Sequence, residues 1–94
     1  MKRAVLDADR KEAMLQQFAE QLSTIRQERG LSQGKLAKLS GIDRTTICHY
    51  EAGRRHPGLF AAAALDRALG AGGKLVEAAG YVVVVVGKEQ PSEQ

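Results

Sequence analysis

One short segment, Arg44 to Glu51, brings together polar side chains that can recognise another molecule. Arg44, Thr45 and Thr46 begin the segment and His49 follows three residues later, with no Gly or Pro among them. An arginine fork can bind guanine O6 and N7 through two parallel hydrogen bonds, and a threonine methyl can contact the methyl group of thymine. The segment therefore offers the chemistry of base recognition. A solvated polar surface is the alternative for each side chain, and His49 has a phosphate contact as a further one.

Neither catalytic nor metal-binding chemistry is indicated by the sequence. Ser, His and carboxylate residues are scattered without a nucleophile-elbow pattern, and the glycines do not form a phosphate loop. The single cysteine, Cys48, cannot form an internal disulfide, and no Cys/His cluster has metal-ligand spacing. We therefore predict a protein that is not an enzyme and needs no cofactor or metal, with Cys48 as a small, half-buried residue.

The composition fits a single globular domain with a localised positive charge. Of the 94 residues, 44% are hydrophobic and 27% are charged, and the net charge is +3. Residues 22–58 contain seven basic and three acidic side chains, a net charge of +4, so the rest of the chain carries −1. Met1 to Arg10 lacks the apolar run of a signal peptide, and the aliphatic run Val82 to Val86 is too short to span a bilayer. These features predict a cytoplasmic protein outside the membrane, whose positive segment suits a polyanion.

Helices are the elements expected to position the recognition segment. Apolar residues at helical spacing predict a first helix from about Asp7 to Arg29, which a glycine ends. Ser32 is a suitable N-cap for a short second helix over 33–40. Asp43 is a suitable N-cap for a third helix, which covers the recognition segment 44–51.

The second and third of these helices fit the positional requirements of a helix-turn-helix. Counting from Gln33, the fifth position is Ala37, where a larger side chain would push the two helices apart. The ninth position is Gly41, where the turn needs a positive φ. Ile47 and Tyr50 fill the fifteenth and eighteenth positions, on the inward face of the third helix. Four requirements met at fixed offsets favour this motif over an accidental helical hairpin.

The rest of the chain predicts one more helix and a strand. A fourth helix is expected over 57–69, with Leu59 among its inward-facing residues. Residues 74–79 fit either a last helical turn or the first arm of a hairpin. The segment Tyr81 to Val86 is β-branched after its tyrosine and predicts a strand. A single strand cannot satisfy its own backbone groups, so its partner is either the preceding segment or the same strand of a second subunit.

The stretch IRQERGLSQGKLAKLSGIDRTTICHYEAGRRHP resembles the DNA-binding domain of the lambda-repressor and Cro type of regulators, also called xenobiotic-response-element-like. The resemblance covers about Phe18 to Leu69. It implies a mainly α fold, a four- to five-helix lambda-repressor-like DNA-binding domain, to which this sequence adds a short C-terminal β-strand. We expect the helix-turn-helix domain with its long first helix at 1–70, a strand-containing dimerisation segment at 71–87 and a flexible tail at 88–94.

The resemblance also implies roles for individual residues. Ser32 and Gln33 match the start of the family's second helix, where a glutamine side chain and the helix amides hold a phosphate. Arg26 and Glu51 match a pair that has a structural role in the family. The residues that match the base-contacting positions of the recognition helix are Arg44, Thr45 and His49, with Thr46 beside them.

Arg54 and Arg55 lie in a basic loop just after the recognition helix, which predicts phosphate contacts for both. Together these residues predict a sequence-specific transcriptional regulator that binds the major groove of double-stranded DNA. Its simplest form is a repressor that acts as a homodimer on a palindromic operator in the nucleoid. One alternative is an antitoxin-like interaction protein that binds a protein partner through its C-terminal segment and controls its own operon. Another is a helical bundle that binds only protein and has no salt-dependent affinity for DNA.

Overall fold

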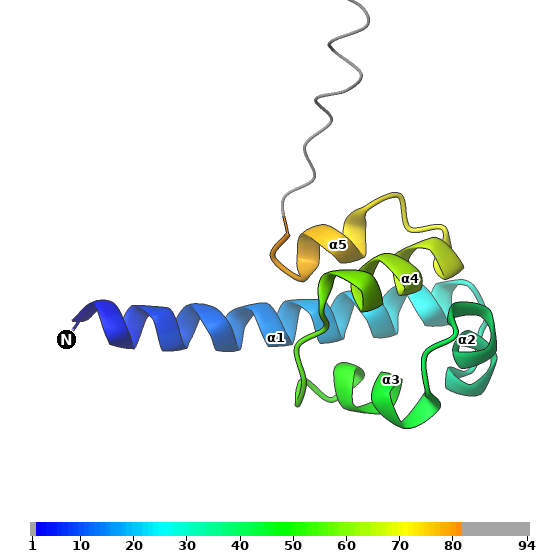
Figure 1. Cartoon of the computed structure of the whole chain (residues 1–94), viewed down its shortest axis with the longest axis horizontal. Coiled ribbons are helices and arrows are strands. Elements are labelled where there is room, and N and C mark those ends of the chain that lie inside the picture. Colours follow the sequence, from blue (N-terminus) through cyan, green and yellow to red (C-terminus); the bar gives the residue numbers. More distant parts are fainter. Residues whose placement is uncertain (1, 82–94) are drawn as a thin grey trace, which may run out of the picture.

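The computed structural model describes the backbone of residues 2–81 and the side chains of residues 11–81. This part of the chain is helical, without a strand, and Figure 1 shows the order of its helices. The five helices are α1 (Lys2–Glu28), α2 (Gln33–Ser40), α3 (Arg44–Glu51), α4 (Leu59–Leu69) and α5 (Lys74–Ala78). The strand predicted for 81–86 and the tail predicted for 88–94 lie outside the described residues, except for Tyr81, which is in no strand.

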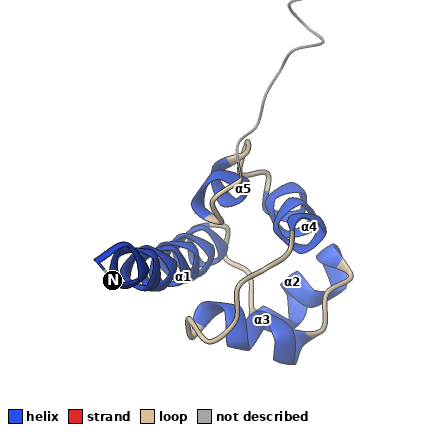
Figure 2. Ribbon diagram, turned by 60° about the vertical axis from the view of Figure 1, so that its left-hand side comes forward, coloured by secondary structure: helices blue, strands red, loops and turns tan. Residues whose placement is uncertain are grey.

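The long helix α1 packs mainly against two of the other helices. Its C-terminal half packs against α3 on one side and α5 on the other, whereas its N-terminal half extends beyond them (Figures 1 and 2). Phe18, Leu22 and Ile25 form the buried stripe of this helix. The helix begins at Lys2, five residues before the predicted start, because residues 2–6 contain no helix-breaking residue that would end it.

Local capping fixes the two helices of the helix-turn-helix. The Ser32 side chain accepts a hydrogen bond from the backbone N–H of Lys35, and the Asp43 side chain accepts one from Thr45. Gly41 ends α2 with φ +78°, a left-handed conformation that an L side chain disfavours. These caps explain why both helices begin, and why α2 ends, where the sequence predicted.

All five helices meet in one hydrophobic core. In α3, Ile47 and Tyr50 are buried as predicted, and the Tyr50 ring meets the Phe18 ring of α1 edge to face at a centroid distance of 5.9 Å. The prediction that Leu59 faces inward is wrong, because its side chain is 54% exposed. Leu59 lies in the first turn of α4, ahead of Ala62, the first buried residue of that helix.

Residues 74–78 form helix α5, so the hairpin alternative for 74–79 is wrong. Helix α5 packs against α4 and α1, and Leu75 is fully buried in the same core as the helix-turn-helix. Asp66 of α4 holds the start of α5: one carboxylate oxygen accepts a hydrogen bond from Gly73 N and the other from Leu75 N, both at 2.9 Å. This carboxylate is buried and satisfied, and its role is therefore to join α4 to α5.

Candidate nucleic-acid interface

The outward face of α3 carries Arg44, Thr45 and Cys48, whose side chains are all exposed. The prediction that Cys48 is half-buried is wrong. Cys48 lies one turn after Arg44, and residues four apart share a helix face, so helical spacing alone could have placed it there. Because Ile47 and Tyr50 anchor the opposite face in the core, these three side chains are held outward by packing.

The N-terminus of α2 lies beside this face. Gln33 lines a hollow of about 160 Å³ together with Arg44, Thr45 and Cys48. The structure thus brings together three residues that the sequence singled out, and adds Cys48 to them. A side chain or an oxygen of a bound partner that entered this hollow would meet an amide from α2 and a guanidinium and a hydroxyl from α3.

The start of α2 also presents backbone N–H groups. Its first intrahelical hydrogen bond runs from Leu36 N to Ser32 O at 3.0 Å, and the amides of Gln33 and Gly34 precede that bond. The Ser32 hydroxyl caps the helix by accepting from Lys35 N at 3.0 Å. The hydroxyl is therefore engaged within the protein, and the preceding amides are the groups with the geometry for an anion.

A partly buried ion pair ties α1 to the end of the recognition helix. Arg26 Nε donates to one Glu51 oxygen at 2.6 Å and a terminal nitrogen donates to the other at 3.0 Å, while the second terminal nitrogen donates to Leu31 O at 2.7 Å. Gln33 Nε2 adds a hydrogen bond to Glu51 at 3.0 Å. The hydrogen bonds that Arg26 donates to Glu51 raise the pKa of Arg26 above its ordinary value, so the guanidinium stays charged throughout the usual pH range. This network fixes α1, α2 and α3 relative to one another.

Replacing Glu51 by alanine is expected to lower the free energy of unfolding by about 2–3 kcal/mol, because it leaves the Arg26 charge without its partner. The Arg26 and Glu51 side chains are only 13% and 9% exposed, so water cannot fully replace the lost contacts. Urea denaturation measures the change. Glu28 provides a matched control, since its ion pair with Arg29 is 3.9 Å long and exposed, and Glu28→Ala should cost less than about 0.5 kcal/mol. Equal losses in the two variants would contradict a structural role for the buried pair.

The remaining predicted residues lie at the edges of this face. Thr46 and His49 are half-buried on α3, and neither lines the hollow beside Gln33. Arg54 and Arg55 are exposed in the loop that follows, where Arg54 N donates to His49 O at 3.0 Å. The two arginines therefore continue the exposed surface beyond the C-terminal end of the recognition helix.

A broad groove between α2 and α3 adds a cation that was not among the predicted site residues. It has a volume of about 640 Å³ and includes Lys38 and Arg44 in its lining. Lys38 is exposed near the end of α2. Lys38 belongs to the positively charged segment 22–58, which was the sequence signal for a role at this interface. The orientation of its side chain depends on how α2 packs on α3.

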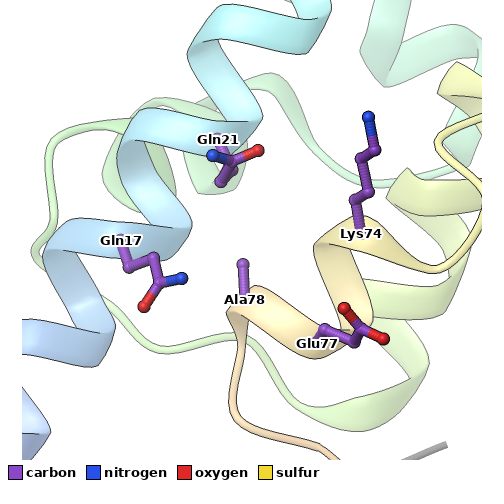
Figure 3. Close-up of a pocket in the computed structure, with 5 residues that line it drawn as sticks. All are labelled: Gln17, Gln21, Lys74, Glu77 and Ala78. Carbon is purple, nitrogen blue, oxygen red and sulfur yellow. The ribbon is translucent and has the colours of Figure 1, made fainter.

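A different kind of hollow lies between α1 and α5 (Figure 3). Gln17 and Gln21 extend into it from α1, and Lys74 and Glu77 belong to α5. Its volume is about 510 Å³, and the opposite charges of Lys74 and Glu77 give it no net sign. It contains none of the residues that the helix-turn-helix exposes.

The described residues were also compared with the requirements of a metal site and of a membrane-spanning helix. No three or more His, Cys, Asp or Glu side chains among residues 11–81 are grouped so that they could hold a metal ion. None of the described helices is long and apolar enough to cross a membrane.

Two short helices joined at a left-handed glycine, with the second helix buried on one face and polar on the other, define a helix-turn-helix protein. The family model described as a helix-turn-helix domain matches residues 17–79, so the chain belongs to this family of DNA-binding domains. The match confirms the helix-turn-helix interpretation of the sequence and is consistent with the lambda-repressor and Cro type. No curated protein and no solved structure matches the chain significantly.

Proposed function

We propose that this chain is a sequence-specific transcriptional regulator that binds double-stranded DNA as a homodimer and represses transcription by covering promoter DNA. The observation that carries the proposal is the exposed triplet Arg44, Thr45 and Cys48 on a helix whose other face is fixed in the core. A helix presented in this way can enter the major groove with its N-terminal residues against base edges. Arg44 then binds a guanine, and the small side chains of Thr45 and Cys48 contact thymine methyl groups.

Phosphate contacts are assigned to the groups that surround this helix. The amides at the start of α2 and the Gln33 side chain bind one phosphate, as a helix N-terminus does for anions, with Ser32 holding that end of the helix in place. Arg54 and Arg55 bind phosphates beyond the end of α3. Thr46 and His49 are proposed as contacts at the margin of the groove, because both are partly exposed on the same helix.

A selection of bound sequences from random duplexes tests the proposal directly. A homodimer of this domain should enrich a palindrome with two identical half-sites, since the symmetry of the protein is mirrored in its operator. Enrichment of a single, asymmetric site would refute the dimeric form of the proposal. The absence of any enriched sequence would refute sequence-specific binding.

The affinity for duplex DNA is expected to fall steeply as salt is raised, because each phosphate contact releases counterions. The slope of log K against log salt concentration grows by about 0.9 for each contact, so Arg54→Ala/Arg55→Ala should flatten it by about 1.8 for each subunit bound, which is about 3.6 for a dimer on the full operator. Sequence preference should change little, because phosphate contacts carry no base information. Fluorescence anisotropy at several salt concentrations measures both quantities.

The control for this experiment removes the same charge elsewhere. Arg67 and Lys74 are exposed on α4 and α5, outside the helix-turn-helix, and their double alanine variant should retain the full slope. An unchanged slope in the Arg54/Arg55 variant would remove these arginines from the interface.

A further inference from the structure

A half-enclosed hollow lies between α1 and the loop that follows the recognition helix. Its volume is about 410 Å³, and it is lined by Met14 and Leu15 together with Lys11, Arg54 and His56. Lys11, Met14 and Leu15 belong to α1, whereas Arg54 and His56 belong to the loop between α3 and α4. The volume lies within the range of small-molecule sites in proteins.

The lining divides into an apolar part and a positively charged part. Met14 and Leu15 are half-buried and supply the apolar surface, and most of the exposed lining is apolar. Lys11 and Arg54 are exposed cations, and neither forms an ion pair with an acidic side chain of the described residues. Such a site matches a molecule with an apolar body and one negative group.

Neighbouring contacts keep the hollow in shape. His56 Nε2 donates to Ala79 O at 2.7 Å, which joins the loop to the residue after α5. Gly80 lies so close to Met14 that a Cβ at that position would overlap the methionine methyl group. The methionine methyl can move aside, but Gly80 also has φ +94°, so the backbone conformation calls for glycine there.

We propose that this hollow binds a small amphipathic carboxylate, with its hydrocarbon body against Met14 and Leu15 and its carboxylate on Lys11 and Arg54. The hollow between α1 and α5 (Figure 3) is a poorer candidate for such a ligand, because its side chains are polar and its charges cancel. Among the described residues that line it, the α1–loop hollow combines an apolar surface with two cations and no acidic side chain.

The site shares Arg54 with the proposed DNA interface, and this part of the inference rests on the proposed function. A carboxylate that engages Arg54 competes with a DNA phosphate for the same guanidinium. The two ligands must then weaken each other's binding to the same extent. The hollow would make the regulator responsive to a small organic acid.

Octanoate is the probe, and calorimetry on the full-length protein without DNA tests the site on its own. We expect a dissociation constant on the order of 1 mM for a ligand of this size in a half-open site. Octyltrimethylammonium, which has the same chain with the opposite charge, and acetate, which lacks the chain, should not bind. Binding of the ammonium as tightly as octanoate would overturn the proposal.

Two variants separate the site from general adhesion to an apolar surface. Leu15→Trp fills the hollow and should abolish octanoate binding, whereas Ala13→Trp adds the same side chain at an exposed position that does not line the hollow and should leave binding intact. If Leu15→Trp fails to fold by circular dichroism, Lys11→Ala takes its place. That variant should weaken octanoate by about threefold, as expected for one exposed charge. Unchanged binding in a folded Leu15→Trp or in Lys11→Ala would overturn the site.

The competition with DNA is measured afterwards by anisotropy. Saturating octanoate should lower duplex affinity by about fivefold relative to sodium acetate at the same concentration, which matches the ionic strength. Octanoate binding without any effect on DNA affinity would leave the ligand site standing and overturn its link to Arg54. If DNA itself does not bind, the proposed function fails, and the calorimetry still decides the site.

One competing occupant of the hollow is the chain's own C-terminal segment, which follows Tyr81. A chain that ends at Tyr81 retains every buried residue of the described core, since these lie between Phe18 and Ala79. Octanoate should bind this shorter chain and the full chain alike. Binding to the shorter chain alone would assign the hollow to the C-terminal segment and overturn the proposal for a free carboxylate.

Discussion

Arg44→Ala is expected to lower affinity for the selected operator by roughly 1–3 kcal/mol per half-site, which is about 5- to 150-fold for each subunit, and to relax preference at one base pair in each half-site. The reason is geometric. Arg44 is the first residue of α3, its side chain is exposed, and it lines both the hollow beside Gln33 and the groove that includes Lys38. A guanidinium at that end of the helix has the reach and the two parallel donors to bind a guanine edge.

Two variants separate base recognition from simple charge. Arg44→Lys keeps the charge but loses the fork, so it should recover non-specific affinity without recovering the base preference. Arg67→Ala removes an exposed arginine from α4 and should leave the specific affinity unchanged. Anisotropy with the operator and with single-base variants of it measures these effects. If Arg44→Ala weakens binding equally on every sequence, Arg44 contacts a phosphate and does not recognise a base.

The boundaries of α2 and α3 could be predicted because they depend on residues within a few positions of each end. Ser32 and Asp43 accept hydrogen bonds from the first turns, and Gly41 adopts the left-handed conformation that ends α2. The buried positions Ile47 and Tyr50 follow from helical spacing in the same way. These interactions are local, so the sequence contains their full cause.

The errors concern features that depend on how helices pack. The first turn of α4 carries Leu59 outward although it fits the apolar stripe, and Phe60 beside it is 91% exposed. Whether 74–79 is a helix or a hairpin arm depends on Asp66, whose carboxylate holds the start of α5 from the preceding helix. Asp66 had no local signal, because an acidic residue in a helix most often faces solvent.

The candidate site could likewise be predicted where it depends on local helical register, but not where it depends on the angle between helices. The positions of Arg44 and Thr45 on the outward face follow from the register of the helix, and the same register applied to Cys48 would have placed it beside them. The contact of Gln33 with Glu51 and the position of Lys38 near Arg44 both depend on the angle between α2 and α3. That angle is set by the core and by the Arg26 network, and neither is visible in a pattern of residues.

The second major expectation concerns assembly: a chain that ends at Tyr81 should remain folded, lose the dimer and bind the full operator much more weakly. Cutting earlier, after Gly72, would remove the buried Leu75 and Ala78 and would confound assembly with folding. Ending at Tyr81 keeps α5 and the hydrogen bond from the Tyr81 hydroxyl to Pro57 O at 3.2 Å. The full chain and the chain that ends at Tyr81 therefore differ only in residues 82–94.

The expectation rests on the sequence that the shorter chain lacks. Residues 82–86 are five consecutive valines, and such a segment has two apolar faces and no charge or proline to prevent edge pairing. We propose that it pairs with the same segment of a second subunit. A twofold pair would hold two recognition helices about 34 Å apart, which matches half-sites separated by about ten base pairs.

Sedimentation equilibrium measures the oligomeric state of both chains, and fluorescence anisotropy measures their affinity for the operator. Together they test the proposed dimer. The full chain should be a dimer and should bind the palindrome far more tightly than a single half-site, because the second half-site is bound at a high effective concentration. The shorter chain should be a monomer and should bind the palindrome and the half-site about equally per site. Val84→Lys in the full chain should have the same effect without shortening the chain. A charge at the centre of the pairing segment opposes burial of that segment. If the shorter chain is still a dimer, the subunits associate through the helical domain itself, and the C-terminal valines have another role.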